Sequence, residues 1–190
     1  MSDIALFHPS FGVTPGVLDA AVRLRDAGHR VLVVDQYDGR TFTDYDEADD
    51  FVQAIGFPEL MDRALRAVRD LPDGFVAAGF SNGGGMAEYV ATRRRCSRVL
   101  LLSGALPVAM LGADGWPAGV PAQIHYATGD PRRNPAWLDA LRAEIEAAGA
   151  TAELFEYDRD GHLFTDPSLP EEYDAQATEL LWSRALAFCA

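Results

Sequence analysis

The sequence predicts an α/β fold in which a mostly parallel sheet of about six strands carries helices on both faces. Apolar runs of strand length alternate along the chain with amphipathic helical patterns, and this alternation is typical of β-α-β units. The apolar runs are continuous, as expected for strands that are buried on both faces of a parallel sheet. Glycine and proline punctuate the boundaries between the two kinds of pattern.

Six runs have the length and composition of buried strands. They occupy residues 4–7, 30–34, 75–80, 98–103, 122–127 and 151–157. Five helical patterns accompany them, beginning at Val17, at Glu59, after Ser81, at Ala136 and at Glu171.

Two longer stretches, residues 35–57 and 104–120, show no regular pattern, and each follows the carboxyl end of a predicted strand. Open α/β sheets bind their ligands at these strand ends. We therefore expect the two stretches to form the rim and walls of a pocket.

Length, charge and cysteine content limit the classes of protein to consider. A chain of 190 residues predicts a single domain spanning residues 1–190. Its formal charge of -13 disfavours binding to nucleic acid or to anionic membranes. No apolar run has the length of a membrane span and no signal peptide is visible, so a cytoplasmic location is expected. Cys96 and Cys189 lack metal-ligand or disulfide spacing, and we expect no metal and no other cofactor.

The most informative motif is Gly79-Phe80-Ser81-Asn82-Gly83, which fits G-x-S-x-G at a junction between a predicted strand and a predicted helix. A serine on such a sharp turn is exposed as a nucleophile, and the flanking glycines permit the close approach of neighbouring backbone. The alternatives are a glycine-rich turn with an ordinary exposed serine, and a phosphate-binding loop. The second is disfavoured because neither phosphate-loop pattern nor a nearby lysine is present.

A nucleophilic serine requires a histidine as its base. In the order serine, acid, histidine, His162 is the best candidate because it lies in DRDGHLFTD, a loop between the last strand and the last helix. His125 also follows Ser81, but it lies within an apolar strand and is interpreted as a core residue. Asp130 is the predicted acid, since it directly follows the fifth strand.

Backbone N–H groups are expected to stabilise the oxyanion of the reaction. Asn82 supplies one at the start of the helix, and Ser10, in the loop HPSFG after the first strand, is preferred over its neighbour Phe11 for the other. Side chains from strand-end loops are candidates for substrate contact, although each could instead pack a loop onto the sheet or remain in solvent: Phe11, Met110, Trp116, Arg132 and Phe164.

Five segments carry a resemblance to a known family: LFHPSFGVTPGV, VVDQYDGRTF, GFSNGGGMA, HYATGDP and GHLFTDP. The chain resembles the dienelactone hydrolase family of α/β-hydrolases from about residue 4 to about residue 188. The resemblance implies an α/β-hydrolase fold without a large cap domain, with Ser81, Asp130 and His162 as the catalytic residues and the backbone of Asn82 and Ser10 as oxyanion donors.

The chain also departs from that family's pattern. Enzymes that open dienelactones carry cysteine at the position of Ser81, a glutamate at that of Pro9 and an arginine at that of Asp166. The expected function is therefore hydrolysis of a small-molecule carboxylic ester or lactone through an acyl-enzyme. The alternatives are a thioesterase or peptidase with the same residues, and a non-catalytic protein that binds a small ligand on this fold.

Overall fold

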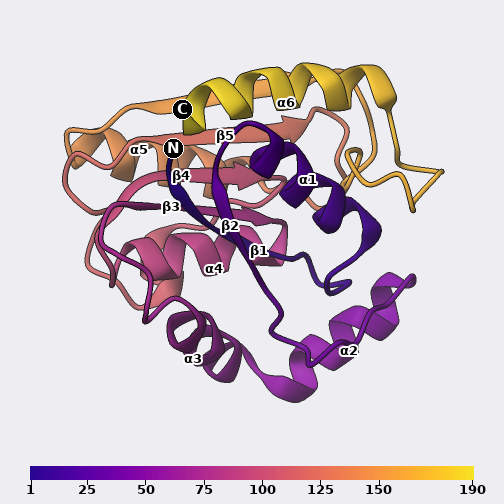
Figure 1. The fold of residues 1–190 in the computed structure, drawn as a ribbon, viewed down its shortest axis with the longest axis horizontal. Helices are drawn as coiled ribbons and strands as arrows, with labels where there is room; N and C mark the ends of the chain where they lie inside the picture. Colours follow the sequence, from indigo (N-terminus) through magenta and orange to yellow (C-terminus); the bar gives the residue numbers. More distant parts are fainter.

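The computed structural model describes residues 1–190 and confirms the predicted fold class. Six parallel strands form one sheet in the order β2-β1-β3-β4-β5-β6 (Figure 1). The strands are β1 (Asp3–Phe7), β2 (Arg30–Val34), β3 (Phe75–Phe80), β4 (Cys96–Leu102), β5 (Ala122–Ala127) and β6 (Ala152–Tyr157). The predicted bounds of β2, β3 and β5 agree with these residue for residue.

Helices cover both faces of the sheet. They are α1 (Pro15–Asp26), α2 (Tyr45–Ile55), α3 (Phe57–Ala67), α4 (Asn82–Ala91), α5 (Pro135–Ala147) and α6 (Ala175–Cys189), with a short 3-10 turn over Val108–Leu111. One apolar cluster joins the sheet to α1 and α6, and the other joins it to α3, α4 and α5. Figure 1 shows α6 above the sheet and α3 and α4 below it. None of these helices is long and apolar enough to cross a membrane.

The continuous apolar strands follow from this double cover. In β3, Phe75 and Ala77 belong to one apolar cluster, whereas Val76, Ala78 and Phe80 belong to the other. Because successive side chains point to opposite faces, a strand between two helical layers needs apolar residues at every position. Every residue of β3 and β5 is buried, while the edge strands β2 and β6 are partly exposed.

Two helix predictions need correction. The stretch 35–57 is not irregular throughout, because it contains α2, whose N-cap Asp44 accepts a hydrogen bond from the Glu47 N–H at 3.0 Å. Tyr45, Ala48, Val52 and Ile55 recur at helical spacing, a signal that the sequence interpretation missed. The last helix begins at Ala175 and not at Glu171.

The strand order places two loops side by side at one edge of the sheet. β1 lies between β2 and β3, so the chain leaves β1 toward one side and returns as β3 on the other. The carboxyl ends of such strands form the crevice in which α/β proteins bind ligands. The loop after β1 and the turn after β3 therefore meet at the expected site.

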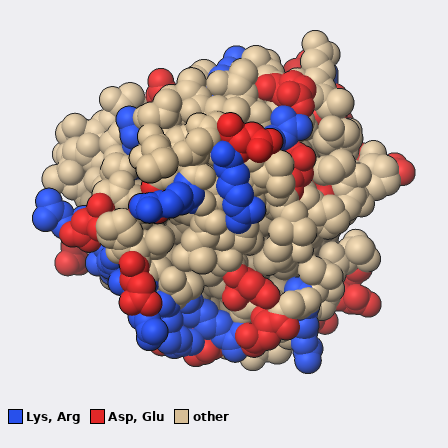
Figure 2. Space-filling model, in the orientation of Figure 1, with Lys and Arg blue, Asp and Glu red and all other residues tan.

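Figure 2 shows acidic and basic side chains interspersed over one face of the molecule.

Candidate active site

Ser81 lies on a strained turn between β3 and α4. Its backbone has φ 50° and ψ −116°, a conformation that non-glycine residues rarely adopt. Two hydrogen bonds hold the turn: the Ser81 N–H donates to the Leu102 carbonyl, and the Gly84 N–H donates to the Ser81 carbonyl, both at 2.8 Å. These two hydrogen bonds hold the Ser81 backbone in its strained conformation and fix the serine at the carboxyl end of β3.

The glycines around Ser81 are required by close backbone contacts. A Cβ atom on Gly79 would lie 1.9 Å from the Gly83 carbonyl oxygen, and one on Gly83 would lie 2.4 Å from the Phe7 carbonyl oxygen. The steric reason predicted for both positions is therefore correct. Gly104, after β4, is a third such position, because its Cβ would lie 2.2 Å from the Ser81 carbonyl oxygen.

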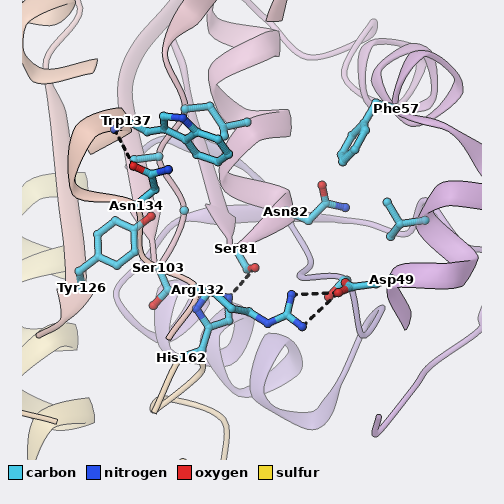
Figure 3. Close-up of a pocket in the computed structure, with 15 residues that line it drawn as sticks. Asp49, Phe57, Ser81, Asn82, Ser103, Tyr126, Arg132, Asn134, Trp137 and His162 are labelled. Atoms are coloured by element: carbon cyan, nitrogen blue, oxygen red, sulfur yellow. Dashed lines mark hydrogen bonds and ion pairs between the residues drawn. The ribbon is translucent and has the colours of Figure 1, made fainter. Parts of the chain in front are cut away.

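A chain of hydrogen bonds joins Ser81 to two residues that are distant in the sequence. His162 Nε2 lies 2.7 Å from Ser81 Oγ, and His162 Nδ1 lies 2.7 Å from Asp130 Oδ2 (Figure 3). The second oxygen of Asp130, Oδ1, accepts the Arg132 N–H at 2.8 Å. Asp130 and His162 are both buried, so these contacts are little weakened by water. The structure thus brings together the three residues that were predicted to act together.

The two predicted oxyanion donors, Ser10 and Asn82, line the same pocket as Ser81. The Ser10 N–H has no hydrogen-bond partner within the protein. Asn82 is the first residue of α4, where a backbone N–H lacks an intrahelical acceptor, and Ser81 makes no side-chain cap to it. Both groups are therefore free to bind an anion at the positive end of the helix dipole.

The sequence itself identifies the family. A sequence model of the dienelactone hydrolase family matches residues 2–190, nearly the whole chain. The chain belongs to the dienelactone hydrolase family. This membership makes the protein a hydrolase, and it confirms the resemblance carried by the five sequence segments.

Solved structures related to this dienelactone hydrolase family member share its fold at low sequence identity. A dienelactone hydrolase-like promiscuous phosphotriesterase from metagenomic libraries aligns with a TM-score of 0.82 at 20% identity, over 100% of this chain and 85% of that chain. An esterase from Thermogutta terrifontis aligns with a TM-score of 0.67 at 16% identity, over 98% of this chain and 82% of that chain. A Bacillus cereus carboxylesterase aligns with a TM-score of 0.55 at 20% identity, over 97% of this chain and 88% of that chain. A comparison with curated proteins gives no match.

The pocket above Ser81 has a volume of about 260 Å³. The side chains of Tyr126, Asn134 and Trp137 lie on one side of Ser81, and Phe57 lies on the other (Figure 3). Both stretches predicted to form its rim contribute to it: Asp49, Val52 and Phe57 come from residues 35–57, and Gly104, Ala105 and Leu106 come from residues 104–120.

Four of the five predicted substrate-contact residues lie outside this pocket. Phe11 and Phe164 are each 1% exposed, because their rings pack against Tyr45 and Tyr157 respectively. Trp116 is buried, with its indole N–H donating to the Val120 carbonyl at 2.7 Å. Met110 is exposed but does not line the pocket.

The aromatic lining comes instead from residues that the sequence interpretation missed. Trp137 lies in the first turn of α5, just after the Asp130 loop, and Asn134 is the N-cap of that helix. The Asn-Pro pair before Trp137 is a helix-start signal that could have placed this side chain near the Asp130 loop. Phe57 opens α3, and Tyr126 is the penultimate residue of β5.

Arg132, the fifth predicted contact residue, does line the pocket, and an acidic side chain already pairs with it. Both terminal nitrogens of its guanidinium lie 3.1 Å from Asp49 Oδ2. The guanidinium also stacks over the ring of Tyr45, 4.0 Å from the ring centre. The ion pair between Arg132 and Asp49 joins α2 to the loop that contains Asp130. Arg132 therefore already has an anionic partner within the protein.

The other histidines near the sheet are structural. His8 Nε2 accepts the Gln36 N–H at 3.1 Å, which leaves the proton on Nδ1, 2.7 Å from the Pro9 carbonyl. His125 lies between the Tyr157 hydroxyl and Gln123, and burial lowers its pKa to about 3. The interpretation of His125 as a satisfied core histidine is therefore confirmed.

Asp166, at the position of the family's arginine, does not line this pocket. Its two carboxylate oxygens accept hydrogen bonds from the Thr14 and Ser168 hydroxyls, both at 2.6 Å. The side chain is buried in this role and stabilises the loop after His162. No group of three or more His, Cys, Asp and Glu residues that could hold a metal ion is present in the protein.

A buried glutamate supports the wall of the pocket. Glu88 on α4 is 0% exposed, and its Oε1 and Oε2 lie 3.1 and 3.4 Å from the Leu106 backbone nitrogen. Burial raises the pKa of Glu88 well above its ordinary value of 4.5, and the nearby charge of Glu144 raises it further, while the hydrogen bond from Leu106 lowers it. The carboxyl group therefore stays protonated to a higher pH than that of an ordinary glutamate.

We predict that Glu88→Gln becomes increasingly stable relative to wild type as the pH rises from 5 toward the raised pKa of Glu88. In this window the native state binds more protons than the unfolded state, so the wild type loses stability by up to about 1.4 kcal/mol per pH unit. Glutamine keeps an acceptor for Leu106 and does not ionise. Thermal unfolding of both proteins across this range measures the difference. Glu146→Gln, on the exposed side of α5, is the control, and a pH-independent difference for Glu88→Gln would contradict the prediction.

Proposed function

We propose that the protein is a serine hydrolase that cleaves small carboxylic esters or lactones through an acyl-enzyme, on a single domain spanning residues 1–190. The observation that carries the proposal is the continuous hydrogen-bond chain from Ser81 through His162 to Asp130. The serine at the start of this chain is presented above the sheet, beside two free backbone N–H groups. A nucleophile, a base, an acid and an oxyanion site are the parts that acyl transfer requires.

The geometry supports a two-step reaction. Ser81 Oγ attacks the ester carbonyl carbon while His162 Nε2 accepts the hydroxyl proton, and the N–H groups of Ser10 and Asn82 stabilise the negative carbonyl oxygen. His162 then gives the proton to the departing alcohol oxygen, leaving Ser81 acylated. In the second step His162 removes a proton from water, the resulting hydroxide attacks the acyl carbon, and His162 returns the proton to Ser81 Oγ as the bond to the acyl group breaks and the carboxylic acid leaves. Asp130 keeps the Nδ1 proton in place and stabilises the charged imidazole.

Serine is the proposed nucleophile because neither cysteine is suited to the task. Cys96 and Cys189 are buried away from the pocket, and burial raises the pKa of each thiol to about 12. Thiolate is the reactive form of cysteine, so both side chains are inert near neutral pH. The small pocket and its three aromatic side chains favour uncharged esters with short acyl groups or aryl groups.

A covalent probe tests the proposal most directly. We expect a fluorophosphonate to label the wild type at one site per chain and to abolish hydrolysis of p-nitrophenyl acetate and butyrate. Intact-mass measurement and peptide mapping should place the adduct on Ser81, and Ser81→Ala should remain unlabelled. A thiol reagent such as iodoacetamide should leave activity unchanged. Labelling of another residue would refute the assignment of Ser81. Saturable ligand binding without turnover on ester, thioester and amide panels would favour a non-catalytic role.

A further inference from the structure

Tyr45 lies where three loops of the proposed active site meet. These are the oxyanion loop (residues 8–12), the acid loop (residues 128–134) and the base loop (residues 158–164), which contain Ser10, Asp130 and His162. We propose that Tyr45 is a positioning residue that holds the three loops in register, and this proposal rests on the function proposed above. Tyr45 does not line the pocket above Ser81, so it acts through other residues.

The hydroxyl group of Tyr45 is linked to the base loop through a glutamate. It donates a hydrogen bond to Glu172 Oε1 at 2.8 Å, and Glu172 Oε2 accepts the backbone N–H of Leu163 at 2.6 Å. Leu163 directly follows His162. Packing is tight here, because a Cβ on Gly161 would lie 2.4 Å from the Glu172 carbonyl oxygen. A displacement of Glu172 would therefore move the residues on both sides of His162.

The ring of Tyr45 supports the acid loop. The Arg132 guanidinium lies 4.0 Å from the ring centre, a distance at which cation–π attraction is effective. Arg132 is tied to the acid by its own backbone, since its N–H donates to Asp130 Oδ1 at 2.8 Å. Asp49, one helical turn after Tyr45 on α2, accepts hydrogen bonds from both terminal nitrogens of the same guanidinium. Tyr45 and Asp49 together fix the side chain of Arg132.

The same ring packs against the oxyanion loop. The Phe11 and Tyr45 ring centres are 4.4 Å apart, and Phe11 is adjacent to Ser10 in the chain. The Phe11 carbonyl also accepts the Phe42 N–H at 2.9 Å, just before α2 begins. The ring centre of His162 lies 6.2 Å from that of Tyr45, in an edge-on arrangement. One side chain thus contacts all three loops through its ring and its hydroxyl.

The phenol of Tyr45 remains neutral when the proposed reaction occurs. Burial raises its pKa, and the hydrogen bond to the Glu172 carboxylate raises it further. A neutral hydroxyl can donate to a carboxylate, and hydrogen bonds to charged acceptors are among the stronger ones in proteins. The contact is therefore suited to hold Glu172, and through it the base loop, in one position.

Kinetics of Tyr45→Phe test the proposal. Phenylalanine keeps the ring contacts and removes only the hydrogen bond to Glu172. We expect kcat for p-nitrophenyl butyrate to fall by about tenfold while KM changes by less than about twofold, because small displacements of catalytic groups slow chemistry more than binding. Tyr45→Ala also removes the ring contacts, and its kcat should fall by about a hundredfold. Tyr89→Phe is the matched control, since Tyr89 also carries an arginine over its ring, at 3.7 Å, but lies outside the pocket.

A double-mutant cycle identifies the route of the effect. If Tyr45 acts through Glu172, adding Tyr45→Phe to Glu172→Ala should not lower kcat further, and Glu172→Gln should recover part of the loss. Full additivity, a kcat for Tyr45→Phe equal to that of Tyr89→Phe, or an effect on KM alone would overturn the proposal. Ser81→Ala separates a failure of the proposed function from a failure of the role of Tyr45. If Ser81→Ala retains activity, the proposed function is wrong. If Ser81→Ala is inactive and Tyr45→Phe is fully active, only the role of Tyr45 is refuted.

Discussion

Ser81→Ala is expected to lower kcat for an activated ester such as p-nitrophenyl acetate by about 10⁴- to 10⁶-fold. Alanine removes the only hydroxyl that lies within 2.7 Å of His162 Nε2, so no acyl-enzyme can form. The fold should be unaffected, because the turn is held by backbone hydrogen bonds and not by the serine side chain. Steady-state kinetics and thermal unfolding measured on the same preparation separate these two effects.

The loss of kcat in Ser81→Ala should not add to the loss of kcat in His162→Ala. His162→Ala alone should be nearly as damaging, and the double variant should be little worse than either, because the base serves no purpose without its nucleophile. Ser183→Ala, on the exposed side of α6, provides the control. Additive losses, or Ser81→Ala with more than about a tenth of wild-type kcat, would show that Ser81 and His162 do not act as a unit.

The meeting of Ser81, Asp130 and His162 could be predicted because each residue follows a recognisable strand. The runs that became β3, β5 and β6 are readable as strands, although the edge strand β6 is partly exposed, and each of the three residues lies in the loop after one of them. In a parallel sheet these loops share one edge, so the order along the chain is enough to bring the side chains together. The glycine spacing also predicts the turn that carries Ser81, since a Cβ atom on Gly79 or Gly83 would collide with backbone atoms.

The lining of the pocket could not be predicted in the same way. Whether an aromatic residue in a loop faces the pocket or the core depends on packing between elements that are far apart in the sequence. Trp116 and Phe164 turn into the core, whereas Trp137 and Phe57 are exposed at 38% and 48% and face the pocket. Hydrophobicity alone does not distinguish the two cases. The missed helix α2 is a different case, because its apolar residues do recur at helical spacing and could have been read.

Asp130 is the residue at which the hydrogen-bond geometry makes the sharpest prediction about the proposed mechanism. Its two oxygens have different donors: the His162 imidazole at Oδ2 and the Arg132 backbone N–H at Oδ1. A carboxylate accepts both, but an asparagine has only one oxygen. If that oxygen stays with Arg132, the amide NH₂ faces His162 Nδ1 and forces the proton onto Nε2, where it points at Ser81. If the amide is reversed, two donors confront each other at Arg132.

Asp130→Asn should therefore lower kcat by about 10⁴-fold with little change in KM, since the imidazole is held in the tautomer that cannot accept the serine proton. Fluorophosphonate labelling of Ser81 should slow in parallel, because it depends on the same proton transfer. Asp158→Asn changes the net charge equally in the same region of the fold, and Asp158 is exposed, so it should retain wild-type kinetics. If Asp130→Asn were as active as Asp158→Asn, the orientation of His162 would have to come from another group, and the proposed role of Asp130 would be wrong.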